Sequence, residues 1–263
     1  MGEERDARRL DRVPDGRTTM NVKETLHEKM KKGALHMTLI DPAKQEPKMA
    51  AKIGRTAFEL GTDAIMVGGS TGVTQENLDA TVLAIKKQVD IPVIYFPSGA
   101  NAISPYVDAI YFMSMLNSRS IQLVVREQML GAPIIRKLKV EPLSMGYIIV
   151  APGMKVGEVG DAECIPRDDA KTAVAYALAA QYMGMGAVYL EAGSGAPQPV
   201  PEDMIRAVRE AIDIPLLVGG GIRDAETAAR IKRAGASIVV TGTIVENGNY
   251  HSRLDSIIKA IKN

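Results

Sequence analysis

A glutamate and a glycine-rich loop follow one short apolar stretch in the second half of the sequence. Residues 187–190 have the apolar character of a buried strand, and Glu191 comes near its end. Gly193 and Gly195 permit positive φ, so the amides around Ser194 can point inward as a group of N–H donors. Such a loop suits a phosphate group, and it lies directly beside a carboxylate.

Two later stretches of the chain repeat this design. Residues 216–218 lead into a run of three glycines at 219–221, and residues 238–240 lead into Thr-Gly-Thr at 241–243. Both apolar runs are typical of buried strands that end in a tight, small-residue loop. Three neighbouring strand ends would then surround one anion.

The first half of the sequence places two oxygen-bearing side chains after strands. Asp41 follows the apolar run 34–40, and Ser70 lies in a Gly-Gly-Ser loop after residues 64–67. Taken alone, Asp41 is better explained as a helix cap, and the Ser70 loop as a simple turn. Because neighbouring loops of a barrel share one rim, the two side chains together indicate a site for Mg²⁺, completed by water and phosphate oxygens.

Other chemistry is less well indicated. His27, His36 and His251 show no zinc-ligand spacing with one another or with Cys164. Glu191 has two interpretations: a carboxylate on the catalytic face of a barrel, or an acceptor for the amides of its own loop.

The elements that must position these groups alternate regularly. Apolar strands are predicted at 34–40, 64–67, 92–96, 109–113, 146–150, 187–190, 214–218 and 237–240. Helices are predicted at 48–60, 75–89, 120–138, 168–183, from about 201, at 224–234 and at 252–262, with one more helix at 21–32 before the first strand. This order favours a (β/α)8 TIM barrel with an added N-terminal helix. A doubly wound sheet is the alternative, but no G-x-G-x-x-G follows the first strand.

Three connections are unusual. The crossover 97–108 has twelve residues with two prolines and a glycine, so its helix is expected to be missing or reduced to a turn. The helix 120–138 is expected to bend at Gly131 and Pro133. Residues 151–166 are expected to form a loop, in which Lys155, Glu158 and Asp161 belong to a mobile lid or simply to the surface.

Composition limits the class of partner. The chain has 263 residues, which suits a single barrel domain at 20–263 after a flexible charged tail at 1–19. A net charge of +1 gives no electrostatic footprint for nucleic acid. The lone Cys164 and the lack of a long apolar run predict a cytoplasmic protein without a transmembrane segment. We therefore expect a small-molecule partner.

The motifs together resemble one enzyme family. Leu-Ile-Asp-Pro-Ala-Lys at 39–44, Val-Gly-Gly-Ser at 67–70, Tyr-Leu-Glu-Ala-Gly-Ser-Gly at 189–195, Val-Gly-Gly-Gly-Ile-Arg at 218–223 and Thr-Gly-Thr at 241–243 resemble the geranylgeranylglyceryl phosphate synthases of archaea. Related bacterial heptaprenylglyceryl phosphate synthases often carry lysine where this chain has Leu39. That difference favours the archaeal group and leaves one phosphate contact of the bacterial type unmatched.

The resemblance implies an Mg²⁺-dependent prenyltransferase. It would join a geranylgeranyl group from its diphosphate to the 3-hydroxyl of sn-glycerol 1-phosphate, as a homo-oligomer (dimer or hexamer) whose product is delivered to the membrane. Glycerol phosphate would contact Tyr189, Leu190, Glu191, Ala192, Gly193, Ser194, Gly195, Gly220, Gly221, Gly242 and Thr243. Asp41 and Ser70 would bind the metal, and Glu191, with Tyr189 beside it, would be catalytic as the general base.

Two further expectations follow from this chemistry. A twenty-carbon tail needs a long apolar groove, which the missing helix would open beside Tyr95, Ile103, Tyr106 and Phe112. Self-association is expected through the apolar positions Ile121, Val124, Val125, Met129 and Leu130. The competing functions are a sugar-phosphate isomerase or lyase and a non-catalytic phosphometabolite-binding barrel. An isomerase would need an acid or base at the end of strand five, where the chain has only Val-Ala-Pro-Gly at 150–153.

Overall fold

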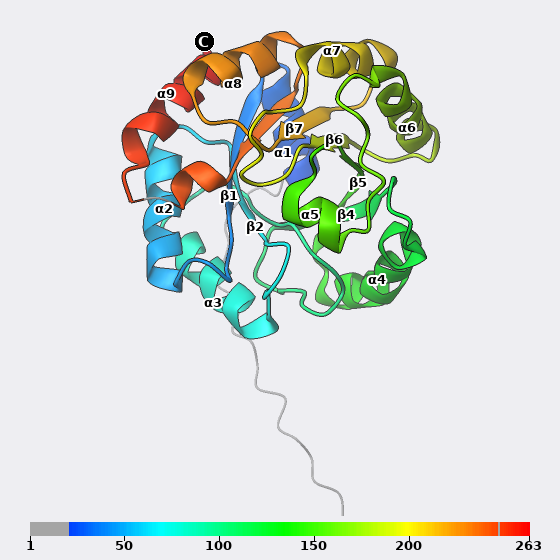
Figure 1. Ribbon diagram of the computed structural model, residues 1–263. Helices are drawn as coiled ribbons and strands as arrows, with labels where there is room; N and C mark the ends of the chain where they lie inside the picture. Colours follow the sequence, from blue (N-terminus) through cyan, green and yellow to red (C-terminus); the bar gives the residue numbers. More distant parts are fainter. Residues whose placement is uncertain (1–20, 247) are drawn as a thin grey trace, which may run out of the picture.

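The computed structural model describes residues 21–246 and 248–263, and its strands form a closed parallel barrel in chain order (Figure 1). The strands of this described part are β1 (Leu35–Ile40), β2 (Ala64–Val67), β3 (Val93–Tyr95), β4 (Ala109–Met115), β5 (Glu141–Ile149), β6 (Val188–Glu191), β7 (Leu216–Gly219) and β8 (Ile238–Thr241). Pairing of β1 with β8, from Leu35 opposite Ile238 to Thr38 opposite Thr241, closes the ring. The predicted (β/α)8 barrel is confirmed.

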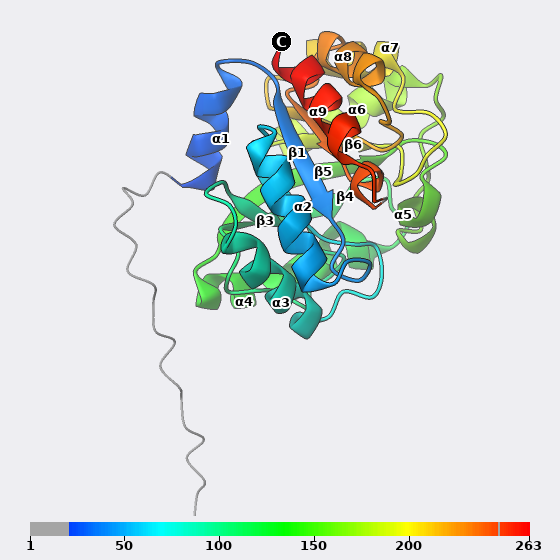
Figure 2. The ribbon, with the colours of Figure 1, turned by 90° about the vertical axis from the view of Figure 1, so that its left-hand side faces the viewer.

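Helices cover the outside of the barrel. They are α2 (Pro47–Glu59), α3 (Gln75–Lys86), α4 (Glu127–Leu138), α6 (Ala170–Tyr182), α7 (Glu202–Ala211), α8 (Ala225–Arg233) and α9 (His251–Lys262). The predicted N-terminal helix is also present as α1 (Val22–Met30), and Figure 2 shows it at the opposite end of the barrel from α5 (Met154–Val159). Glu141 at the start of β5 accepts the N–H groups of Val22 (2.6 Å) and Lys23 (3.0 Å), which ties α1 to the bottom of the barrel.

Alternation along each strand divides the core into two layers. Inside the barrel lie Met37, Met66, Tyr111, Met145, Tyr147, Tyr189 and Leu217. Between the strands and helices lie residues of the opposite parity, such as Ile40, Ile65, Val67 and Leu190. Because successive side chains point to opposite faces, Tyr189 faces the interior while Leu190 faces the helices.

The crossover between β3 and β4 has no helix, as predicted. Residues 96–108 form only turns and extended segments, so a loop separates α3 from α4 in Figure 1. Side chains of the two flanking helices hold this loop: Gln75 Oε1 accepts the Ile103 N–H (3.0 Å), and Glu127 Oε2 accepts the Ala100 N–H (2.6 Å).

Several predicted boundaries were wrong. β5 begins at Glu141 rather than 146, because β4 is also longer than predicted and pairs with it from Ala109–Glu141 to Met115–Tyr147. Polar residues and a proline in the first half of β5 concealed this pairing.

The predicted helix 120–138 is irregular at a different place. α4 runs through both Gly131 and Pro133 without a break, and the irregular turn lies earlier, in the π-helix η1 (Gln122–Arg126). There the Glu127 N–H donates to the Gln122 carbonyl, five residues back. The segment 151–166, expected as a loop, contains the short helix α5.

The predicted tail at 1–19 lies outside the described residues. None of the helices in residues 21–246 and 248–263 has the length and apolar character needed to cross a membrane.

Candidate active site

The carboxylate of Glu191 is buried at the C-terminal end of β6, with 7% of the residue exposed. Its Oε1 accepts the Gly193 N–H at 2.6 Å, and the Tyr189 hydroxyl donates to the same side chain. Burial raises the pKa of Glu191, and these two hydrogen bonds partly offset that rise. The two interpretations of Glu191 are therefore compatible: it holds its own loop and it faces the open end of the barrel.

A small hollow lies between the C-terminal ends of β6, β7 and β8. Its lining includes Glu191, Ser194, Gly195, Gly220, Gly221, Arg223, Gly242 and Thr243. The Ser194 and Thr243 hydroxyls lie 3.0 Å apart, and Arg223 holds the 195–197 turn by donating to the carbonyls of Gly195 (2.9 Å) and Pro197 (3.1 Å). The three loops thus meet as predicted, in a form suited to one phosphate.

Glycine is required where two of these loops touch. Gly220 has φ of +84°, and a Cβ there would lie 2.7 Å from the Gly193 nitrogen. The close approach leaves room for backbone donors but not for a side chain. Leu190 and Ala192, also predicted to contact the substrate, instead pack in the outer core layer.

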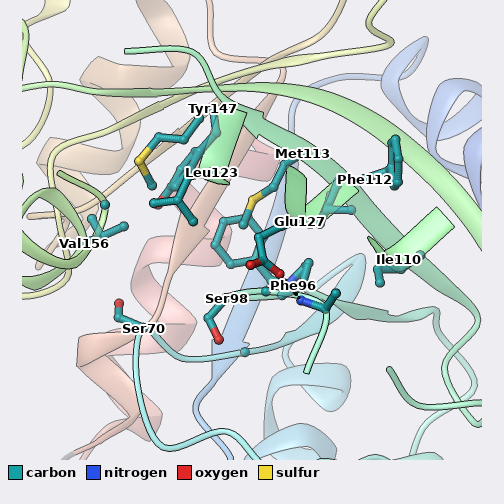
Figure 3. A pocket seen from close by; sticks show the side chains of 18 of the residues that line it. Ser70, Phe96, Ser98, Ile110, Phe112, Met113, Leu123, Glu127, Tyr147 and Val156 are labelled. Atoms are coloured by element: carbon teal, nitrogen blue, oxygen red, sulfur yellow. Dashed lines mark hydrogen bonds between the residues drawn. The ribbon is translucent and has the colours of Figure 1, made fainter. Parts of the chain in front are cut away.

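A larger cavity of about 300 Å³ lies next to this hollow. Figure 3 shows its wall, which is built mainly from apolar side chains of β4, η1 and α5, including Ile110, Met113, Leu123 and Val156. Leu39, Glu191 and Ser194 line both spaces. The buried carboxylate therefore stands where a polar hollow meets an apolar cavity.

An aromatic cluster forms the floor of the larger cavity. The Tyr147 ring lies 5.2 Å from that of Tyr189 and 5.4 Å from that of Phe96, measured between centroids. Burial, and secondly the charge of Glu191, raise the pKa values of Tyr147 and Tyr189, so both hydroxyls remain protonated. Sequence reasoning missed Phe96 and Tyr147. No local signal marks Tyr147, because its place depends on the register that pairs it with Tyr189 across β5 and β6.

Only part of the predicted groove border lines the cavity. Ile103 and Phe112 do, whereas Tyr95 and Tyr106 pack with the outer core layer. The error at Tyr95 is one of parity: its neighbour Phe96 points inward, so Tyr95 must point outward.

The two predicted metal ligands lie on adjoining loops. Asp41 Oδ1 accepts the Ala43 N–H at 2.9 Å, and a Cβ on Gly69 would lie 2.6 Å from Oδ2, so the carboxylate packs against the loop that carries Ser70. Ser70 lines the larger cavity. Burial raises the pKa of Asp41, which the Ala43 N–H and Lys44 partly offset.

This set of donors suits Mg²⁺, which takes many of its ligands from water and substrate, better than a metal ion whose ligands all come from the protein. Within the described part of the chain, no three His, Cys, Asp or Glu side chains converge as a metal cluster. One carboxylate and one hydroxyl are hard oxygen donors that leave several positions for water and substrate phosphate, as Mg²⁺ prefers.

Fold and site together define a phosphate-binding (β/α)8 barrel enzyme for a substrate with a large apolar group. The chain belongs to the PcrB family, whose model matches residues 25–263.

Relatives of this chain match its sequence over most of their length. A geranylgeranylglyceryl phosphate synthase from Pyrococcus horikoshii is 51% identical over 242 residues, covering 92% of this chain and 95% of the relative. The crystal structure of (S)-3-O-geranylgeranylglyceryl phosphate synthase from Thermoplasma acidophilum, in complex with substrate sn-glycerol-1-phosphate, is 48% identical with a TM-score of 0.90, covering 93% of this chain and 99% of that one. A tryptophan synthase alpha chain from Legionella pneumophila, at 15% identity and a TM-score of 0.64, shares the fold alone.

The raised pKa of Glu191 predicts a pH-dependent effect of Glu191→Gln on stability. Because the pKa is higher in the folded than in the unfolded protein, the stability contribution of Glu191 is full below the unfolded pKa and falls as pH rises through the folded value. Glutamine does not titrate, so the variant should melt at a higher temperature than the parent at pH 7.5, and the gain should shrink toward pH 4. Melting curves at both values test this, with exposed Glu210→Gln as the control. A lower melting temperature for Glu191→Gln at pH 7.5 would contradict it.

Proposed function

We infer that this chain is a prenyltransferase that forms the ether bond between a geranylgeranyl group and the 3-hydroxyl of sn-glycerol 1-phosphate, the first ether-bond step of archaeal membrane lipid synthesis. The observation that carries this inference is the position of Glu191, at the junction of the phosphate hollow and the apolar cavity. The relatives, about half identical over nearly the whole barrel, support the choice of substrates.

The reaction needs a base beside a positioned hydroxyl. Backbone donors at 194–195, 220–221 and 242–243 hold the phosphate of glycerol phosphate, which leaves the far hydroxyl facing Glu191. The hydroxyl oxygen forms a bond to the first carbon of the prenyl group, the bond from that carbon to the diphosphate oxygen breaks, and the diphosphate leaves with the electron pair. Glu191 accepts the hydroxyl proton, and the Tyr189 hydrogen bond keeps its carboxylate oriented.

The same reaction produces an anionic leaving group near Asp41 and Ser70. These two residues would hold Mg²⁺, which when bound supplies positive charge to the diphosphate oxygens. The cavity, lined mainly by apolar groups beside the missing helix, would receive the prenyl tail and keep water from the reacting carbon. A sugar-phosphate isomerase or lyase would have no use for such a cavity.

A direct assay tests the proposed function. Purified protein, sn-glycerol 1-phosphate, labelled geranylgeranyl diphosphate and Mg²⁺ should give a labelled product that extracts into organic solvent. Acid phosphatase should remove its phosphate and leave the label joined to glycerol, because the ether bond is not a substrate for that enzyme. Glu191→Gln should lower kcat by about 10²- to 10⁴-fold with little change in glycerol phosphate binding, since general base catalysis contributes that much. Absence of product from the parent protein would refute the function, and loss of binding alone in the variant would refute the base.

The metal assignment predicts a loss in Asp41→Asn. The variant keeps the shape of the side chain but removes its charge, so turnover should fall on the order of 100-fold or more and require more Mg²⁺. Turnover measured against Mg²⁺ concentration checks this, with Asp213→Asn as a surface control. Parental turnover at saturating Mg²⁺ would exclude Asp41 as a ligand.

The cavity predicts selective loss of long substrates in Ala100→Trp. Ala100 lines the cavity, whereas Ala102 is buried in the core, where tryptophan would disturb folding. Lost contact with only three methylenes costs about 2.4 kcal/mol, or roughly 50-fold in affinity. kcat/KM should therefore fall for geranylgeranyl but not for geranyl diphosphate, with exposed Asn101→Trp as the matched control. Equal losses for both substrates would place the tail elsewhere.

We also propose that the chain self-associates through η1 and α4. Ile121, Val125, Met129 and Leu130 are each about half exposed, at 49–59%, whereas Val124 is partly covered. A row of exposed apolar side chains on one helical face is typical of an interface. Location in the cytoplasm and delivery of product to the membrane remain predictions.

Disruption of this face should yield single chains. Met129→Glu is expected to lower the molar mass measured by light scattering at micromolar concentration, because a charge at a buried interface is unfavourable. Met49→Glu, at an exposed apolar position on α2, is the control. A parent protein that scatters as a single chain would contradict the proposal.

A further inference from the structure

Lys44 stands between two carboxylates at the open end of the barrel. Its Nζ lies 2.8 Å from Glu246 Oε1 and 4.0 Å from Asp41 Oδ2. Asp41 and Lys44 belong to the loop after β1, whereas Glu246 follows the short 3-10 helix η2 (Thr243–Val245) after β8. One ammonium group thus joins the loops on both sides of the β1–β8 pair.

The geometry makes this ion pair easy to exchange. The Lys44 side chain is 50% exposed and that of Glu246 is 28% exposed, and an exposed pair of this kind contributes little to stability. The lysine ammonium is a compact charge on a flexible stem, so it can turn from one partner to another nearby. The arrangement holds a mobile cation close to the active site.

The position of Asp41 shows what Lys44 can reach. The Asp41 carboxylate packs against Gly69, and the loop 68–70 lines the larger cavity. An ammonium 4.0 Å from Asp41 is therefore close enough to turn toward an anion bound beside the Asp41 carboxylate. The mechanism above leaves extra negative charge at that place when the carbon–oxygen bond breaks.

We propose that Lys44 is a catalytic residue that contacts the leaving diphosphate, and that Glu246 holds it aside until that substrate binds. This proposal rests on the proposed prenyl transfer. The ammonium donates charge-assisted hydrogen bonds to the diphosphate oxygens and stabilises the electron pair that they receive, without transferring a proton. Glu246 then competes with the substrate for the same cation.

This competition gives substitutions of the two partners opposite effects. Lys44→Gln should weaken binding of inorganic pyrophosphate in the presence of Mg²⁺ by about 10- to 100-fold, as expected for lost hydrogen bonds to a charged group. The same variant should raise KM for geranylgeranyl diphosphate and leave KM for glycerol phosphate within about twofold. Glu246→Gln should tighten pyrophosphate binding, because it frees the ammonium.

Calorimetric titration with pyrophosphate and steady-state kinetics measure these effects, with Lys52→Gln on α2 as the surface control and Lys44→Arg as the charge-keeping variant. Weaker binding in Lys44→Gln, partial recovery in Lys44→Arg and tighter binding in Glu246→Gln support the proposal. Equal losses in Lys44→Gln and Glu246→Gln, with matching drops in melting temperature, would show a purely structural ion pair and overturn it.

The binding readout separates this proposal from the proposed function. If the parent forms no ether product but Lys44→Gln still loses pyrophosphate, the prenyl transfer is wrong and the diphosphate contact stands. If the parent forms product and Lys44→Gln binds pyrophosphate and turns over like the parent, the role of Lys44 is overturned while the function stands.

Discussion

A carboxylate buried inside the barrel constrains the rest of the active site. A charge in this environment is strongly unfavourable unless hydrogen bonds compensate it, and Glu191 obtains them from the Gly193 N–H and the Tyr189 hydroxyl. The first of these bonds turns the loop after β6 back toward its own strand. That turn brings Gly193 so close to Gly220 that position 220 does not tolerate a side chain, while Gly153 and Met154 exclude one at position 193. The conformation that exposes backbone donors for a phosphate is thus a consequence of burying this carboxylate.

The opening beside β3 follows from a second constraint, the removal of one helix from the ring. A strand without a covering helix would expose apolar surface, yet the inner face here is closed by Phe96 and the aromatic cluster, and the outer face is filled by Tyr95, Ala102 and Val107. Gln75 and Glu127 satisfy two backbone amides of the loop that replaces the helix. These two backbone groups are therefore paired although the cavity beside them is apolar. Such a cavity can admit a hydrocarbon chain.

Local signals in the sequence were sufficient for the barrel and for the two polar ends of the site. Strand runs that end in Asp41, Ser70, Glu191 or a glycine loop identify the catalytic rim because all parallel strands of a barrel end there. Register and parity could not be read in the same way. Phe96 and Tyr147 gain their roles only when β3, β5 and β6 are aligned, and the assignment of Tyr95 failed by one residue. The early start of β5 and the π-turn of η1 likewise depend on neighbouring elements rather than on their own residues.

The loop at 241–243 follows β8 and Asp41 follows β1, and because these strands are paired, the two polar regions lie side by side at the open end of the barrel. Behind the site, the ring nitrogens of buried His36 lie 2.9 Å from the hydroxyls of Thr62 and Thr241, which joins β1 to the end of β8 and to the start of β2. Burial lowers the pKa of His36 to about 3, so the imidazole is neutral near pH 7 and adds no charge to the region. The positive charge near this junction comes instead from side chains on the open face, where substrates and solvent can reach them.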